Sequence, residues 1–275
     1  MDGAGRRVVV VVRADFGVKN TRMDRPRLAE SAVERIRRER YAPRRVQFDY
    51  LHLRDLRARL LAAFAALPNI SGPALDLFCG TQPYREMIPV KPVWGLDLDR
   101  RFGRTDVIGG VPLPFADASF GIILCGQAIH MIDDPAGTVR EIARVLKPGG
   151  SAIVTLPHIF RREIPQERKL SSAELLEIFA GWDATLIGFG GLGSALMCAT
   201  AGLMNSVYRR WGFARALGAP AAILANAICG VFDAVTSQTQ TRVPANLLLV
   251  ATRTVRPHYE PAPGTLRQSP QTNQK

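Results

Sequence analysis

The sequence predicts an α/β protein with a doubly wound, mostly parallel sheet. Short apolar runs alternate with helical patterns, which is typical of parallel strands joined by helices. One run stops at a glycine-containing turn and the next ends in a carboxylate, as strands do at a ligand-binding sheet edge. Seven strands are expected, near residues 74–78, 93–98, 105–109, 120–126, 151–157, 184–189 and 247–252.

Helices are expected before and between these strands. Proline stands near the start of three of them, where its fixed φ suits a first helical turn. Ser171 and Glu174 form a capping box at the start of the last one. The expected ranges are 26–40, 47–67, 83–88, 135–146 and 171–179.

One domain with appendages is the natural expectation for 275 residues. Residues 46–255 are expected to form it, with an apolar helical insert at 190–240 between the sixth and seventh strands. Residues 1–45 are expected to be a basic N-terminal extension. Residues 256–275, rich in Pro, Gln and Thr, are expected to be a disordered tail.

The net charge of +12 is concentrated toward the N-terminus. Such asymmetry can mark contact with nucleic acid or an anionic membrane. However, the arginines of the 26–40 helix are interleaved with Glu30, Glu34 and Glu39, which favours a solvated, partly paired helix face. Aromatic interleaving and zinc-finger spacing are absent from the sequence, so no nucleic-acid partner is expected.

The four cysteines are far apart in the sequence and suggest neither a disulfide framework nor a metal site. A basic segment followed by an apolar signal core is not found at the N-terminus. The expected location is cytoplasmic, with membrane association as the open alternative.

Residues 73–84 are the most informative stretch of the chain. An apolar run containing Asp76 stops at Cys79 and Gly80, and Pro83 follows. This strand–turn–helix pattern offers backbone N–H groups to a nucleotide-like cofactor. Asp97 ends the next run about 20 residues further on, where a carboxylate can reach ribose hydroxyls.

The glycines that this stretch lacks limit the choice of cofactor. The dinucleotide fingerprint G-x-G-x-x-G is absent, because Gln82 and Pro83 stand where further glycines would fall. The phosphate-binding pattern G-x-x-x-x-G-K-[ST] is absent from the sequence as well. A carboxylate in the first strand followed by one glycine suits a cofactor without phosphates.

Three further motifs follow in order. Residues 113–120 read LPFADASF, residues 129–135 read IHMIDDP, and residues 141–150 read EIARVLKPGG. Together with residues 73–84, these motifs resemble the class I S-adenosylmethionine-dependent methyltransferases, specifically the methyltransferase type 11 family. The resemblance covers roughly residues 73–157.

The resemblance implies a Rossmann-like methyltransferase fold whose seven-stranded sheet has an antiparallel last strand. It also implies S-adenosylmethionine as cofactor, with no metal. Asp97 is the expected ribose ligand, with Asp99 as its alternative. The cofactor-binding residues that the resemblance implies are Asp76, Phe78, Cys79, Gly80, Asp97, Leu98, Phe115, Asp117 and Gln127.

The sequence departs from the family pattern in the same regions. Phe78 stands where the family usually has a glycine after the first strand, and Gln82 replaces a second loop glycine. Gly109 and Gly110 stand where an Asp commonly contacts the adenine amine. These departures leave open a relative that kept the fold but lost catalysis.

Two histidines are candidate catalytic residues. A sulfonium methyl group is already electrophilic, so methyl transfer mainly requires alignment of the incoming nucleophile. Removing a proton from a hydroxyl acceptor near pH 7 favours histidine as the base. His158 follows the fifth strand and His130 the fourth, and His158 is preferred. For each, a histidine that bonds loop backbone is the alternative.

The insert between the last two strands is the unusual part of the chain. Residues 184–208 and 216–232 carry no charged side chain, and the first run is long enough to cross a bilayer. Its glycines would weaken a helix, which favours two helices packed on the sheet edge as a lid or homodimer surface. Peripheral membrane contact and a true span are the alternatives.

The sequence therefore predicts an S-adenosylmethionine-dependent methyltransferase acting on a small molecule or a lipid- or sugar-linked acceptor. Two other functions stay open. One is a non-catalytic binding protein with a methyltransferase fold, and the other is a peripheral membrane protein that uses the apolar insert.

Overall fold

The computed structural model describes residues 10–11, 27–68, 71–102, 104–158, 170–210, 214–236 and 244–254. The tail expected at 256–275 lies outside these residues, as does most of the N-terminal extension. The bounds predicted for the domain, its extension and its tail therefore stay predictions.

The sheet is doubly wound, with strand order β1-β4-β3-β2-β5-β6-β8-β7. The strands from β1 to β6 run parallel, whereas β8 runs antiparallel to β6 and β7. This confirms the predicted fold class, with the antiparallel last strand that the resemblance implied. The strands are β1 (Val10–Val11), β2 (Ala74–Leu77), β3 (Val93–Asp97), β4 (Val107–Ile108), β5 (Phe120–Gly126), β6 (Leu146–Pro157), β7 (Asp183–Phe189) and β8 (Asn246–Thr252).

The helices lie close to the predicted ranges, with one exception. The helix expected at 83–88 is a single 3-10 turn, η1 (Arg85–Met87). Ile88 precedes Pro89, and the residue before a proline is disfavoured in helical conformation, so the turn cannot continue. The other helices are α1 (Glu30–Tyr41), α2 (Tyr50–Ala66), η2 (Ile129–Met131), α3 (Pro135–Val145), α4 (Ser172–Ile178), α5 (Leu192–Arg210) and α6 (Ala214–Val235).

Two details of the sheet differ from the expectation. The two-residue strand β1 adds an eighth strand at the edge beside β4. Residues 147–150, which lie between the expected helix and the expected fifth strand, belong to β6, where the pairing shifts from Phe120–Leu146 to Ile122–Ser151. Gly149 takes a φ of +74° within this irregularity, a conformation that suits glycine.

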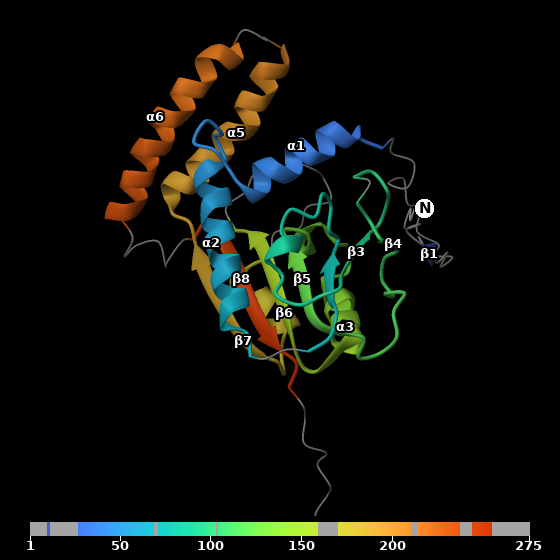
Figure 1. Ribbon diagram of the computed structural model, residues 1–275. Coiled ribbons are helices and arrows are strands. Elements are labelled where there is room, and N and C mark those ends of the chain that lie inside the picture. The colour runs from blue at the N-terminus through green and yellow to red at the C-terminus, as the bar shows by residue number, and fades with distance from the viewer. Residues whose placement is uncertain are drawn as a thin grey trace, which may run out of the picture.

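Each face of the sheet carries its own apolar core. On one face, α3 and α4 contribute Val139, Ile142 and Leu175 to a cluster with β5 and β6. On the other face, α2 contributes Leu56 and Leu60 to a cluster with β2, β3 and β8. Figure 1 shows α2 lying along the front of the sheet and α3 behind it.

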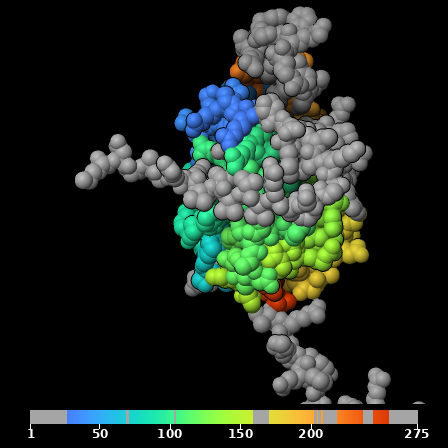
Figure 2. Space-filling view, turned by 90° about the vertical axis from the view of Figure 1, so that its right-hand side faces the viewer, coloured from blue at the N-terminus to red at the C-terminus, as the bar shows by residue number. Residues whose placement is uncertain are grey.

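Three helices extend past one end of the sheet. Figure 1 shows α1 lying across this end and the α5–α6 hairpin projecting beyond it. In Figure 2 the α1 region, in blue, lies at the upper left of the folded body. Helices α5 and α6 lie between β7 and β8 in sequence, which confirms the predicted helical insert.

Candidate cofactor and acceptor site

The loop after β2 forms the floor of the candidate site. Phe78, Gly80 and Gln82 have φ values of 55°, 51° and 51°, so three residues of this short loop are left-handed. Such a conformation is natural for glycine and uncommon for other residues. Phe78 and Gln82 therefore keep the backbone shape that the family's glycines favour, although their side chains differ.

Asp97 at the end of β3 fixes the position of this loop. Its Oδ2 accepts a hydrogen bond from the backbone N–H of Gly80 at 2.8 Å, and its Oδ1 accepts one from Leu98 at 2.8 Å. Burial raises the pKa of Asp97 to about 6, and the two N–H groups work against this rise. Each carboxylate oxygen keeps a lone pair for a ligand hydroxyl.

Asp76 lies on β2 and is buried, with 4% of its surface exposed. Burial, together with the neighbouring charge of Asp97, raises the pKa of Asp76 well above its ordinary value. Within the described part of the chain, its Oδ2 has no hydrogen-bond partner. A buried carboxylate oxygen of this kind is suited to a cationic or hydrogen-donating ligand group.

The side chains of Gln82, Arg85 and Asp106 fix the loop after β2 against β3. The side chain of Gln82 occupies the space over Gly95, where any Cβ would collide with its amide. Arg85 donates to Gln82 Oε1 at 2.9 Å and to Asp106 Oδ2 at 3.0 Å. Asp106 Oδ2 also accepts from the backbone N–H of Gly95 at 2.9 Å, so the loop is tied to β3.

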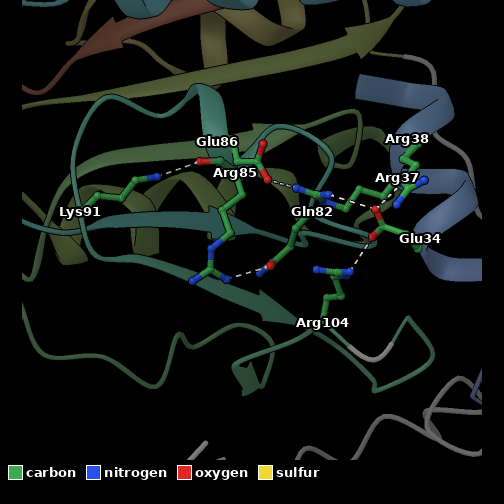
Figure 3. A network of polar contacts seen from close by, with 8 residues as sticks. All are labelled: Glu34, Arg37, Arg38, Gln82, Arg85, Glu86, Lys91 and Arg104. Carbon is green, nitrogen blue, oxygen red and sulfur yellow. Dashed lines mark hydrogen bonds and ion pairs between the residues drawn. The ribbon is translucent and has the colours of Figure 1, made fainter. Parts of the chain in front are cut away.

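Helix α1 is joined to the same region by charged side chains. Arg104 donates to Glu34 Oε2 at 2.7 Å, and Arg38 donates to Glu34 Oε1 at 2.9 Å. Arg37 reaches Glu34 and also Glu86 of η1. Figure 3 shows this network linking α1 to the segments that surround β3. The partly paired helix face predicted for α1 is thus confirmed at Arg37 and Arg38.

A cavity of about 540 Å³ lies between the strand ends and the helices. This volume is in the range of small-molecule and cofactor sites. The loops after β2, β3 and β5 form one wall, and α1, α2 and α5 form the other. The helical wall consists of Ile36, Arg40, Asp49, His52, Leu53, Leu56, Cys198 and Ala201.

His52 and Tyr84 are two of the cavity residues that the sequence did not single out. His52 begins α2 and is 8% exposed; burial lowers its pKa to about 4, so it is neutral at pH 7. Burial raises the pKa of Tyr84 to about 12. His52 falls within the helix expected at residues 47–67. Nothing local indicated that α2 would face the strand ends.

Most of the predicted site residues meet at this cavity. They are Asp76, Phe78, Cys79, Gly80, Asp97, Leu98, Gln127 and His130. Gln127 has a φ of +56° at the end of β5, and its Nε2 has no partner within the described residues.

Three predicted site residues are not among those that line the cavity. Phe115 packs edge-on against Phe120 with ring centroids 4.8 Å apart, and Asp117 pairs with Arg144 at 2.8 Å. The backbone N–H of His158 donates to Ala245 at 2.8 Å. The structure therefore brings His130 into the cavity but not His158, the preferred candidate base.

Gly109 and Gly110 stand where the family commonly has an acidic residue. An added Cβ would lie 3.1 Å from Pro114 Cγ at Gly109 and 3.1 Å from Leu98 Cδ2 at Gly110. Because these side chains already occupy the space, a larger residue there would displace them. The space beside these glycines is therefore filled by apolar side chains.

Residues 75–154 match a family model described as a methyltransferase domain. The match spans β2 through most of β6 and includes both Asp76 and Asp97. This segment of the chain is therefore a methyltransferase domain. The type 11 resemblance drawn from the motifs is thereby confirmed.

Two curated relatives agree with this family. A probable S-adenosylmethionine-dependent methyltransferase of Mycolicibacterium smegmatis is 33% identical over 145 residues, covering 44% of this chain and 56% of the relative. A demethylmenaquinone methyltransferase of Chlorobaculum tepidum is 29% identical over 123 residues, covering 38% and 51%. The chain thus spans about half the length of these relatives.

Among solved structures, the fold is similar to a phosphoethanolamine N-methyltransferase of Haemonchus contortus in complex with S-adenosyl-L-methionine. The TM-score is 0.45 at 18% identity, covering 72% of this chain and 52% of that one.

The cofactor of this family is S-adenosylmethionine, and the residues present fit it. The cofactor carries hydroxyl and ammonium donors, and the cavity offers the carboxylates of Asp97 and Asp76 for them. Gln127 supplies an amide N–H group that has no partner within the described residues. The buried polar atoms left without partners here are therefore of the kinds that such a ligand would satisfy.

Proposed function

We propose that this chain transfers a methyl group from S-adenosylmethionine to a small-molecule or lipid- or sugar-linked acceptor. The observation that carries the proposal is the pair of carboxylates, Asp76 and Asp97, at the ends of adjacent strands in one cavity. Asp97 holds the loop through Gly80 and keeps oxygen lone pairs for the ribose hydroxyls. Asp76 supplies a buried oxygen to the cofactor's ammonium end.

The cavity has room for an acceptor because it continues beyond these carboxylates to the helices. Leu53 and Leu56 give this part of the wall an apolar character, and His52 and His130 give it two imidazoles. Bound cofactor supplies an electrophilic methyl group. The helical wall excludes water and orients the acceptor, which is the main requirement for this transfer. A neutral imidazole can accept the proton of a hydroxyl acceptor.

The relatives favour an acceptor with a lipid-like part. Among them are a demethylmenaquinone methyltransferase and the ubiquinone/menaquinone biosynthesis C-methyltransferase of Desulfotalea psychrophila, 32% identical over 111 residues. Leu53 and Leu56 in the helical wall support the same class of acceptor.

Calorimetric titration with S-adenosylhomocysteine tests the cofactor part of the proposal. The purified protein is expected to bind it, and Asp97→Ala is expected to weaken binding at least about tenfold, because a hydrogen bond to a charged group contributes about 1.5–3 kcal/mol. Asp99→Ala is the matched control. Asp99 caps its own turn through the N–H of Arg101 and is not among the cavity residues, so binding should persist.

Absence of binding to folded wild-type protein would refute the proposal. Where binding occurs, the acceptor is sought with S-adenosylmethionine carrying a labelled methyl group and cell extracts split into organic and aqueous phases. Label in the organic phase indicates a lipid-like acceptor, and label in the aqueous phase a polar one. Binding without any transferred label would favour the non-catalytic binding protein instead.

A further inference from the structure

Helix α6 presents an unbroken apolar face to the surroundings. Leu224, Ile228 and Val231 are 63%, 61% and 65% exposed and lie three or four residues apart, so they share one side of the helix. Every exposed side chain described on α6 is apolar. They are Pro220, Ala221, Ile223, Leu224, Ala227, Ile228, Val231, Phe232, Ala234 and Val235, and we call this set the α6 outer face.

The two polar residues of α6 whose side chains are described, Asn226 and Asp233, point inward. Asn226 Nδ2 donates to the carbonyl oxygens of Arg45 and Gln47 at 2.9 and 2.7 Å. Asp233 accepts from the N–H groups of Gly193 and Ser194 at 2.7 and 2.9 Å. Surface helices of globular proteins show the opposite pattern, with polar residues outside. Polar residues inside and apolar residues outside are typical of protein surfaces that face lipid.

Exposure separates α6 from an ordinary core helix. Residues Gly218–Val235 are apolar enough and long enough to cross a membrane by composition alone, yet only 17% of them are buried. Leu192 and Leu196 of α5, 62% and 60% exposed, add to the apolar surface of the hairpin. An apolar patch of this kind on a soluble domain marks an interaction site.

Exposed basic residues lie beside α6. Arg44 and Arg45 are exposed, and the contact of Asn226 with Arg45 brings this segment against α6. Exposed apolar groups flanked by arginines match an anionic bilayer, whose headgroups attract cations and whose acyl boundary accepts apolar side chains.

We propose that the α6 outer face docks on the surface of an anionic phospholipid bilayer. The apolar side chains enter the boundary between headgroups and acyl chains, while Arg44 and Arg45 beside the helix contact the headgroups. This docking goes beyond the methyl transfer proposed above and does not depend on it. It nevertheless concerns the same site, because α5 also supplies Cys198 and Ala201 to the cavity wall.

Vesicle flotation of the full-length protein tests the docking. The protein is expected to float with vesicles of phosphatidylcholine and phosphatidylglycerol, and to float less with pure phosphatidylcholine or at high salt. The double variant Leu224→Asp/Ile228→Asp is expected to lower the partition coefficient at least about tenfold, because it places two charges where apolar groups enter the bilayer. Leu176→Asp, at an exposed leucine of α4 (43%), is the control and should float like the wild type.

Two results would overturn the proposal. One is a wild-type protein that does not float with anionic vesicles. The other is a double variant that floats as well as the wild type. Light scattering tests the alternative occupant, a second copy of the chain. The face would be assigned to that copy if the wild type does not float and is a dimer that Leu224→Asp/Ile228→Asp converts to a monomer. Circular dichroism checks that the variants fold, and unchanged S-adenosylhomocysteine binding by the double variant keeps this outcome separate from the cofactor proposal.

Discussion

Asp97 is expected to affect both ligand binding and the stability of the fold. Its two oxygens hold the N–H groups of Gly80 and Leu98, and burial raises its pKa to about 6. At pH 7 the carboxylate is ionised in both the folded and the unfolded protein, so the folded protein bears the cost of burying the charge. A carboxylate kept at this cost is expected where a ligand uses it.

The pH dependence of stability should reveal this cost. The folded pKa lies above the ordinary value of 3.8, so folding gains from protonated Asp97 below pH 4 and loses this gain as pH rises through about 6. The free energy of unfolding of Asp97→Asn, relative to wild type, should therefore increase by up to about 3 kcal/mol from pH 4 to pH 7. Urea unfolding of both proteins across this range measures it. Parallel profiles would contradict the assignment.

Residue identity alone could not place every side chain of the site. The motifs correctly predicted that Asp76, Gly80 and Asp97 gather at one place, because strand ends share an edge of a parallel sheet. They placed Asp117 there too, whereas it pairs with Arg144. That pairing depends on how α3 packs beside the loop, which no local pattern encodes.

Among the elements, the strands were the most predictable, because a run buried on both faces is apolar throughout. The prediction of a short helix after Pro83 was wrong, because Pro89 ends the helical segment after one 3-10 turn. The α5–α6 hairpin was predicted as helices, but its orientation was not. The inward contacts of Asn226 and Asp233 and the exposure of Leu224 show that its apolar side faces outward.

The hairpin depends on Asp233 for its internal alignment. Its carboxylate accepts from two N–H groups at the first turn of α5, where backbone donors have no partners in their own helix. Asp233→Asn keeps only one acceptor oxygen, so the free energy of unfolding should fall by about 1–3 kcal/mol.

Urea denaturation measures this loss. Asp183→Asn, at an exposed position of β7, is the control and should change stability by less than about 0.5 kcal/mol. An equal effect of the two substitutions would show that the contact between Asp233 and α5 contributes nothing.

At the scale of the whole molecule, the site is built from two parts of the chain. One part could be predicted from the sequence and the other could not. The strand ends carry family motifs within residues 75–154 and were predicted. The helical wall comes from α1, α2 and α5, which lie outside that range. Its contribution to the site was not predicted. Its position depends on the charged contacts of α1 with Arg104 and Glu86 and on the packing of α2 against the sheet (Figures 1 and 3).

If both walls belong to one site, a ligand bound to the strand ends should also protect the helical wall. Hydrogen exchange with S-adenosylhomocysteine at about 100 times its Kd is expected to slow globally exchanging amides by about 100-fold. Amides that exchange by local opening slow only where the ligand restrains that opening. Peptides from α1 and from residues 74–82 should therefore slow together, more than peptides from α4, which packs on the sheet through the other apolar core. If exchange in α1 slowed no more than exchange in α4, the ligand would contact the strand ends alone. The helical wall would then contact only the acceptor.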